Sequence, residues 1–105
     1  MLNFHAHLFF EPGDAERARA VGSRLAEVAG VSVTGWLDRP GGPLPMPQVQ
    51  VELTSVQLGA VVEWLMLNRA GLSVLIHPET GSDLLDHTDH ALWLGSPLSL
   101  RLDRL

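Results

Sequence analysis

Residues 3–10 read NFHAHLFF, an apolar stretch interrupted by two histidines two positions apart. Side chains of an extended strand alternate between its two faces, so His5 and His7 share one face and the apolar residues at even positions share the other. The stretch therefore predicts a strand that turns one face to the hydrophobic core and presents a pair of imidazoles on the opposite face.

Signals after this strand predict the next elements. Asp14 can cap a helix over about 15–29, and Gly30 suits the position just past its end. Alternating polarity predicts a second strand at 31–37, and a turn rich in proline and glycine follows at 38–47. The first half of the chain thus has the order strand, helix, strand.

The second half repeats that order. Residues 48–53 alternate as a third strand, and Thr54 forms a capping box with Gln57 at the start of a helix that ends at about Asn68. A fourth strand is predicted at 72–77. The chain closes with a polar connection at 78–90 and an alternating stretch at 99–105 that we expect to add a short strand.

This order of elements is the split βαβ, or ferredoxin-like, motif βαββαβ. Right-handed crossovers place the first strand between the third and the fourth, which gives the sheet order fourth, first, third, second. We therefore predict a single α+β domain over residues 1–105, with an antiparallel sheet, two helices on one face and a short extra C-terminal strand.

Composition excludes several classes of partner. The formal net charge is −5, and the seven lysines and arginines form no cluster, which argues against nucleic acid and anionic membranes as partners. The chain has no cysteine, no apolar run long enough to span a membrane and no visible signal peptide, so we expect a cytoplasmic protein. A domain this small buries only about 60–70% of its unfolded surface, and we expect a homodimer.

The sheet face away from the helices is predicted to be polar and aromatic at once. Such a mixture suits a ligand cleft or a wet dimer interface. The side chains that the strand periods place there are His5, His7, Phe9, Thr34, Trp36, Gln48, Gln50, Glu52, Ser73, Leu75 and His77.

Topology gathers the histidines of this face. Because the first and fourth strands are antiparallel neighbours, the fourth strand brings His77 beside His5, and the third strand brings Glu52 toward His5 from the other side. The connection at 78–90 carries Asp86 and His87 to the same end. Two imidazoles with a carboxylate are typical of non-haem Fe(II) sites, and three imidazoles suit zinc as well. The alternative is a set of hydrogen-bonded histidines buried in a dimer interface.

Other catalytic templates find no support. The chain has neither a G-x-S-x-G motif nor a phosphate-binding loop, and its serines lack the spacing of a triad. Trp36 and Trp93 could stack on an aromatic ligand, although packing is the more common use of a tryptophan. Arg69 could meet a substrate carboxylate, but the topology places it at the far end of the sheet.

Four segments resemble the DOPA 4,5-dioxygenase-like family, in order along nearly the whole chain. They are HAHLFF near the start, GPLPMPQVQV, NRAGLSVLIHPETG and DHTDHALWLG. The resemblance implies a ferredoxin-like and commonly dimeric fold. It also implies extradiol cleavage of a catechol such as DOPA by O2 and a non-haem Fe(II), with Zn possible in the protein as isolated.

The matching positions are His5 and His7 of HAH, His77 of HPETG and His87 of DHT. We expect three of His5, His7, His77 and Glu52 to hold the metal. The expected catalytic residues are His77 and His87, with His87 as the acid–base group because an ordinary imidazole titrates near neutral pH. The residues expected to contact a small aromatic diol are Trp93, Gln50 and Trp36.

One position departs from the family pattern. The proline-rich motif of the family usually reads Gly-Pro-His-Pro, whereas this chain has Leu44 in place of the histidine. The departure motivates an alternative function, a catalytically impaired dimeric module that binds a metal or an aromatic ligand. A third hypothesis is a structural dimerisation domain whose open sheet face is simply buried.

Overall fold

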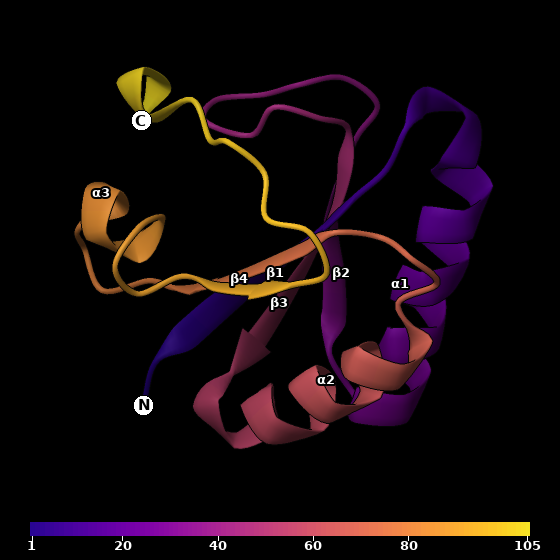
Figure 1. Cartoon of the computed structure of the whole chain (residues 1–105). Coiled ribbons are helices and arrows are strands. Elements are labelled where there is room, and N and C mark those ends of the chain that lie inside the picture. The colour runs from indigo at the N-terminus through magenta and orange to yellow at the C-terminus, as the bar shows by residue number, and fades with distance from the viewer.

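Five strands form one antiparallel sheet in the order β2-β3-β1-β4-β5 (Figure 1). The computed structural model describes all 105 residues. The strands are β1 (Asn3–Phe9), β2 (Ser32–Leu37), β3 (Gln48–Thr54), β4 (Val74–Pro78) and β5 (Leu92–Leu94). The helices are α1 (Ala15–Ala29), α2 (Ser55–Asn68) and the short α3 (Asp83–Asp86), with 3-10 turns at Pro12–Asp14 and Leu102–Arg104.

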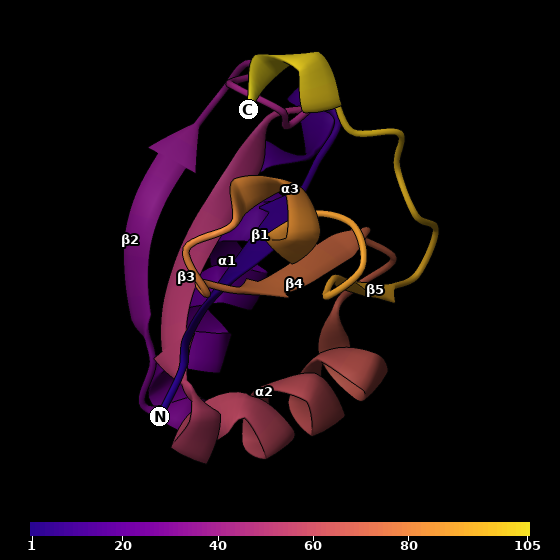
Figure 2. The same cartoon turned by 90° about the vertical axis from the view of Figure 1, so that its left-hand side faces the viewer.

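The α+β fold and the order of the first four strands confirm the prediction. Helices α1 and α2 cover one face of the sheet, and α3 lies on the opposite face (Figures 1 and 2). None of the helices has the length and apolar character needed to cross a membrane.

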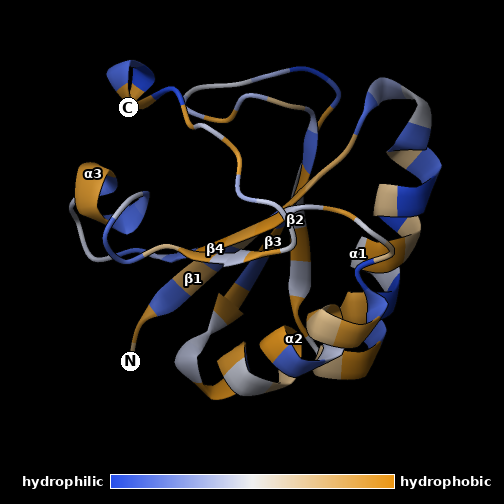
Figure 3. Ribbon diagram, in the orientation of Figure 1, coloured by the Kyte–Doolittle hydropathy of each residue, from blue (hydrophilic) through white to orange (hydrophobic).

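The main core lies between the sheet and the two long helices. It is built from the even-numbered residues of β1 and the odd-numbered valines of β3, packed against Val21 and Leu25 of α1 and Val61 and Leu65 of α2. Gly22 lets α1 approach the sheet closely, because a Cβ there would lie 3.2 Å from a methyl group of Val49. Figure 3 shows α1 with mixed hydropathy, whereas α2 is mostly hydrophobic. This core leaves the face with the histidines free for another purpose.

The helix ends follow the sequence signals with one exception. Gly30 adopts φ 68° and its N–H donates to the carbonyl of Ala26, and the capping box of Thr54 and Gln57 is formed. The predicted cap by Asp14 is wrong, since its side chain makes no cap hydrogen bond and instead accepts one from Arg17 at 2.7 Å.

A β-bulge in β2 overturns the predicted position of Trp36. The register shifts between Val33 and Gly35, so β2 has one residue more than β3 over this stretch. The extra residue turns Trp36 to the helix-covered face, where its ring stacks on Phe10 with centroids 5.0 Å apart. The expectation that Trp36 lies on the open face is therefore wrong.

The extra strand exists, but not at 99–105. Residues 92–94 occupy the free edge of β4, because they come first along the chain after α3. The C-terminal tail, residues 95–105, instead crosses the sheet face opposite α1 and α2. There the N–H of Arg101 donates to the carbonyl of Pro43. Leu98, Leu100 and Trp93 pack on a second hydrophobic cluster of Phe9, Leu44 and Leu75. The apolar alternation of the tail thus reflects packing on the sheet and not strand pairing.

Candidate metal centre

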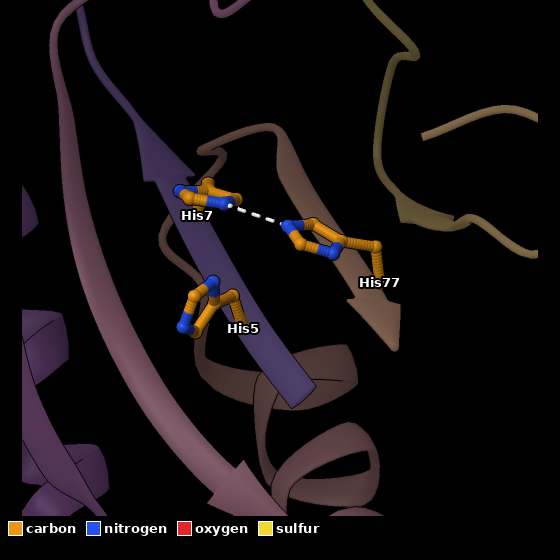
Figure 4. Close-up of side chains that lie close together, drawn as sticks. All are labelled: His5, His7 and His77. Atoms are coloured by element: carbon orange, nitrogen blue, oxygen red, sulfur yellow. Dashed lines mark hydrogen bonds between the residues drawn. The ribbon is translucent and has the colours of Figure 1, made fainter. Parts of the chain in front are cut away.

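Strands β1 and β4 bring three histidines together. His5 and His7 project from the same face of β1, and the strand register pairs His5 with His77 of β4. One ring nitrogen from each of these three residues lies within 4.8 Å of the other two (Figure 4). The sheet itself therefore builds a group of three nitrogen donors, as the strand order predicts.

Hydrogen bonds orient two of these rings. His77 donates from Nδ1 to the carbonyl of Pro78 at 2.9 Å, and His7 donates from Nδ1 to Oε1 of the buried Gln48 at 2.8 Å. The two Nε2 atoms then face each other at 3.1 Å, each with a lone pair. A cation shared by both nitrogens would satisfy this arrangement, and such outer hydrogen bonds typically orient metal-binding histidines.

The protonation state of the buried pair suits metal binding. Burial lowers the pKa of His7 from the ordinary 6.5 to about 3, although the hydrogen bond to Gln48 acts in the opposite direction. Burial likewise lowers the pKa of His77. Both rings are therefore neutral at neutral pH, which is the form that ligates a metal.

The carboxylate beside His5 is Glu79 and not Glu52. Glu79 Oε1 lies 2.6 Å from His5 Nε2, whereas Glu52 Oε2 lies 3.9 Å away. Glu52 pairs with His5 across the strands as predicted, but its carboxylate is absent from the group of donors and does not line the cavity over them. Glu79 follows His77 by two positions, so the strand period could have revealed it on the same face.

The segment after β4 is more ordered than the predicted polar connection. Its buried carboxylate, Asp86, accepts hydrogen bonds from the backbone N–H and the hydroxyl of Thr80 at 2.8 and 2.6 Å. Burial acts to raise the pKa of Asp86, but these hydrogen bonds outweigh it and hold the pKa below its usual value. Asp86 thus fastens α3 over the sheet, a structural use that goes beyond a turn residue.

This fastening places His87 beside the three histidines. Its Nδ1 donates to the carbonyl of Asp83 at 2.7 Å, and its ring centroid lies 4.2 Å from that of His77. The Nε2 atom of His87 is left with a lone pair next to the donor group. His87 therefore lines the cavity beside His77.

A cavity of about 390 Å³ lies over the histidines. Its floor comes from the sheet, one wall from the α3 segment, and the other wall from the proline-rich loop and the tail. Leu44 lines it because this loop folds over the sheet face. The lining residues are His5, His7, Pro43, Leu44, Gln50, His77, Glu79, Gly81, Asp83, Asp86, His87, Arg104 and Leu105.

Only one of the three residues expected at the substrate lines this cavity. Gln50 does so, and its amide donates to Thr34 at 3.1 Å. Trp93 lies on the same side of the sheet but stacks on Phe9, with ring centroids 5.9 Å apart, and does not reach the cavity. Trp36 lies on the opposite face of the sheet.

The donor set fits a divalent transition metal. Three imidazoles suit Fe(II) or Zn(II) and leave further positions for exogenous ligands. No cysteine is present to favour a thiolate site. The chemistry of these side chains is therefore compatible with either ion.

Comparisons with known proteins find a family model and a solved structure that match this chain. A family model described as the Dopa 4,5-dioxygenase family matches residues 4–104. The chain is 41% identical to a candidate dioxygenase of Nostoc punctiforme whose crystal structure superposes with a TM-score of 0.93, over 98% of this chain and 90% of that one.

Two curated relatives are fungal proteins. The chain is 34% identical to an uncharacterised 21.2 kDa protein of Botryotinia fuckeliana, over 94% of this chain and 61% of the relative. It is 32% identical to a DOPA 4,5-dioxygenase of Amanita muscaria, over 97% of this chain and 49% of that protein. The chain thus spans about half to three fifths of the length of these relatives.

Proposed function

The chain belongs to the Dopa 4,5-dioxygenase family, and from this premise we propose that it is a metal-dependent dioxygenase that opens the ring of a catechol by extradiol cleavage. The observation that carries the proposal is the group of three imidazole nitrogens within 4.8 Å at the floor of the cavity. The proposed ligands are His5, His7 and His77. Fe(II), when bound, supplies the redox chemistry through which O2 and the catechol react.

The chain's own groups prepare this site. Pro78 and Gln48 hold the rings of His77 and His7 with their Nε2 lone pairs toward the site, and burial keeps both rings neutral. Glu79 accepts from His5 and restrains its ring in the same way. The donors are therefore oriented before a metal arrives, which reduces the cost of binding it.

The cavity suits a single aromatic ring with a short substituent. Its volume of about 390 Å³ falls at the lower end of the range for small-molecule sites. Leu44 and Pro43 offer an apolar wall, and Gln50 offers an amide on the floor. We place a catechol there, with its hydroxyls toward the three histidines.

His87 is the proposed acid–base residue. Its Nε2 is free because Nδ1 donates to the carbonyl of Asp83, and the ring stands against His77 at the edge of the donor group. In this role His87 takes a proton from a catechol hydroxyl as the substrate binds and returns it to the ring-opened product. His77 contributes as a ligand and as the surface on which His87 rests.

The test is an anaerobic titration of the metal-free protein with Fe(II), followed by addition of a catechol and then air. We expect about one Fe(II) per chain and a yellow ring-opened product. A His7→Gln variant should lose both, and a Glu52→Gln variant should keep both. Absence of bound metal in the unchanged protein would contradict the proposal.

Leu44 favours a second candidate, a binding module that has lost turnover. Leu44 lines the cavity at the position where the family motif usually has a histidine. If that histidine carries protons, this chain binds a metal and a catechol but releases no product. Gain of ring cleavage in a Leu44→His variant would show that the site lacks a single group.

A homodimer is part of the proposal. The tail and the proline-rich loop pack on the sheet face for which a dimer interface was the alternative to a ligand cleft. Helix α2 instead exposes Val56, Met66 and Leu67. Light scattering of the protein and of a Leu67→Lys variant would show whether this helix face joins two copies.

A further inference from the structure

Arg104 is the one residue with a permanent positive charge among those that line the cavity. It ends the 3-10 turn at the C-terminus (Figure 2), and it lines the cavity together with Asp83 and Asp86 of α3. The tail is held there by the hydrogen bond from the Arg101 N–H to the carbonyl of Pro43 at 2.8 Å, and by Leu98 and Leu100 on the second hydrophobic cluster. The cation thus stands on a wall that the fold has fastened to the sheet.

The guanidinium of Arg104 has no partner within the chain. It makes no ion pair within 4.0 Å and no side-chain hydrogen bond, unlike most arginines of this protein. The engaged arginines are Arg17 and Arg24, paired with Asp14 and Glu27, Arg39 beside Asp38, Arg19 over the ring of Trp36, and Arg69 on the carbonyl of Met66. Arg104 is therefore free to meet a ligand.

Two of the three acidic residues of the cavity are already engaged. Glu79 accepts from His5, and Asp86 accepts from Thr80. Neither carboxylate forms an ion pair with Arg104. Asp83, the third acidic residue, also makes no ion pair with Arg104, so the guanidinium keeps its donors for a ligand.

We propose that Arg104 binds a carboxylate group of the substrate, so that the site selects catechols that carry one. The planar fork of a guanidinium matches a carboxylate with two parallel hydrogen bonds. The histidines hold the diol end of such a molecule at the floor, and Arg104 holds the other end at the wall. The inference rests on the proposed function for the identity of the diol, and on Arg104 alone for the carboxylate.

Asp83 favours the opposite charge on the substrate. It lines the opposite wall and its carboxylate has no partner, so it would favour a substrate with a cationic group. However, Asp83 lies in the first turn of α3, where a carboxylate is favourable without any ligand. Arg104 is therefore the charged residue of the cavity for which the fold shows no other role.

The test measures binding of three catechols by anaerobic calorimetry. The probes are 3,4-dihydroxyphenylacetate, which is anionic, 4-methylcatechol, which is neutral, and dopamine, which is cationic. We expect Arg104→Gln to weaken binding of the anionic probe by about 10- to 100-fold and to change binding of the other two by less than about twofold. Arg104→Lys should restore part of the loss, because it returns the charge without the fork.

Arg101 supplies the matched control. It lies three residues earlier in the same tail, has no ion pair and does not line the cavity, so Arg101→Gln should leave all three affinities unchanged. Equal weakening of the three probes by Arg104→Gln would overturn the inference, and so would a preference of the unchanged protein for dopamine.

The same titrations on chelator-treated protein separate this inference from the proposed function. If the protein takes up no metal but Arg104→Gln still weakens only the anionic probe, the proposed function fails and the carboxylate subsite stands. If the metal binds and the ring is cleaved but the three probes respond alike, the subsite fails alone.

Discussion

The Nε2 atoms of His7 and His77 lie 3.1 Å apart in a buried site, although both residues donate their Nδ1 protons elsewhere. Two lone pairs at this distance repel each other unless a cation lies between them. Such a site gains stability when the cation is present, because the metal binds the folded chain far better than the unfolded one.

Metal should therefore raise the melting temperature. At a free Fe(II) or Zn(II) concentration of about one hundred times the dissociation constant, the folded state gains about 2.7 kcal/mol, which for a domain of about 100 residues is a rise of roughly 10–20 °C. Differential scanning calorimetry with and without chelator measures this. The His7→Gln variant should show no rise, and an equal rise in that variant would place the metal elsewhere.

Gln48 should control metal affinity without being a ligand itself, because it orients the ring of His7. Replacing it with leucine removes the acceptor that holds His7, and we expect metal affinity to fall about 10- to 100-fold. The unpaired Nδ1–H should also cost about 1–3 kcal/mol of stability. Competition with a chromophoric chelator measures the affinity. Gln50→Leu is the control, because Gln50 lies on the same strand and bonds Thr34 instead.

Glu79 and Glu52 should differ as partners of His5. Glu79→Gln removes the carboxylate that lies 2.6 Å from His5 Nε2, and we expect metal affinity to fall by about tenfold or more. Glu52→Gln changes a carboxylate at 3.9 Å whose side chain is 47% exposed, and affinity should stay within about twofold. The reverse order of effects would restore Glu52 as the relevant acid.

Asp86 predicts a pH dependence of stability in the metal-free protein. Its pKa is lowered in the folded state, so the ionised group stabilises the fold fully above the unfolded pKa near 3.9 and loses that contribution as pH falls through the folded value. Asp86→Asn should be less stable than the unchanged protein by about 1–3 kcal/mol at pH 7. Urea unfolding should show this gap closing as the pH falls below about 3.9.

The exposed Asp89 is the control for this measurement, since Asp89→Asn changes a side chain that is 79% exposed and should alter stability little. A gap for Asp86→Asn that persists unchanged as the pH falls well below about 3.9 would show that its cause is packing and not charge.

Most of the donor group was predictable from local pattern plus topology. The period of two on β1 is a covalent consequence of extended backbone, and it places His5 and His7 on one face whatever the rest of the chain does. The order of strands and helices along the chain, with right-handed crossovers, then fixes the strand order, and that strand order places His77 beside His5. The place of Glu79 was not predicted, because Pro78 and the following residues resemble a turn. The alternation of the strand nevertheless extends to Glu79.

The position of Trp36 shows where pattern alone fails. A single extra residue in β2 reverses the facing of every side chain beyond it, and the alternating letters contain no mark of where a bulge occurs. The close approach of Gly35 to Gln50, where a Cβ would lie 3.2 Å from the Gln50 Cβ, is the one local feature that accompanies the shift.

By itself the sequence determined the alternation of β1, the ends of α1 and α2, the strand order and hence the three histidines, because each depends on interactions between near neighbours or on the limited number of ways to cross a sheet. Tertiary structure alone decided what stands around them. Leu44 and Arg104 reach the cavity through a loop and a tail whose paths depend on long-range packing and on single hydrogen bonds, such as that of Arg101 to Pro43. Such contacts join residues far apart in the chain, and no local period records them.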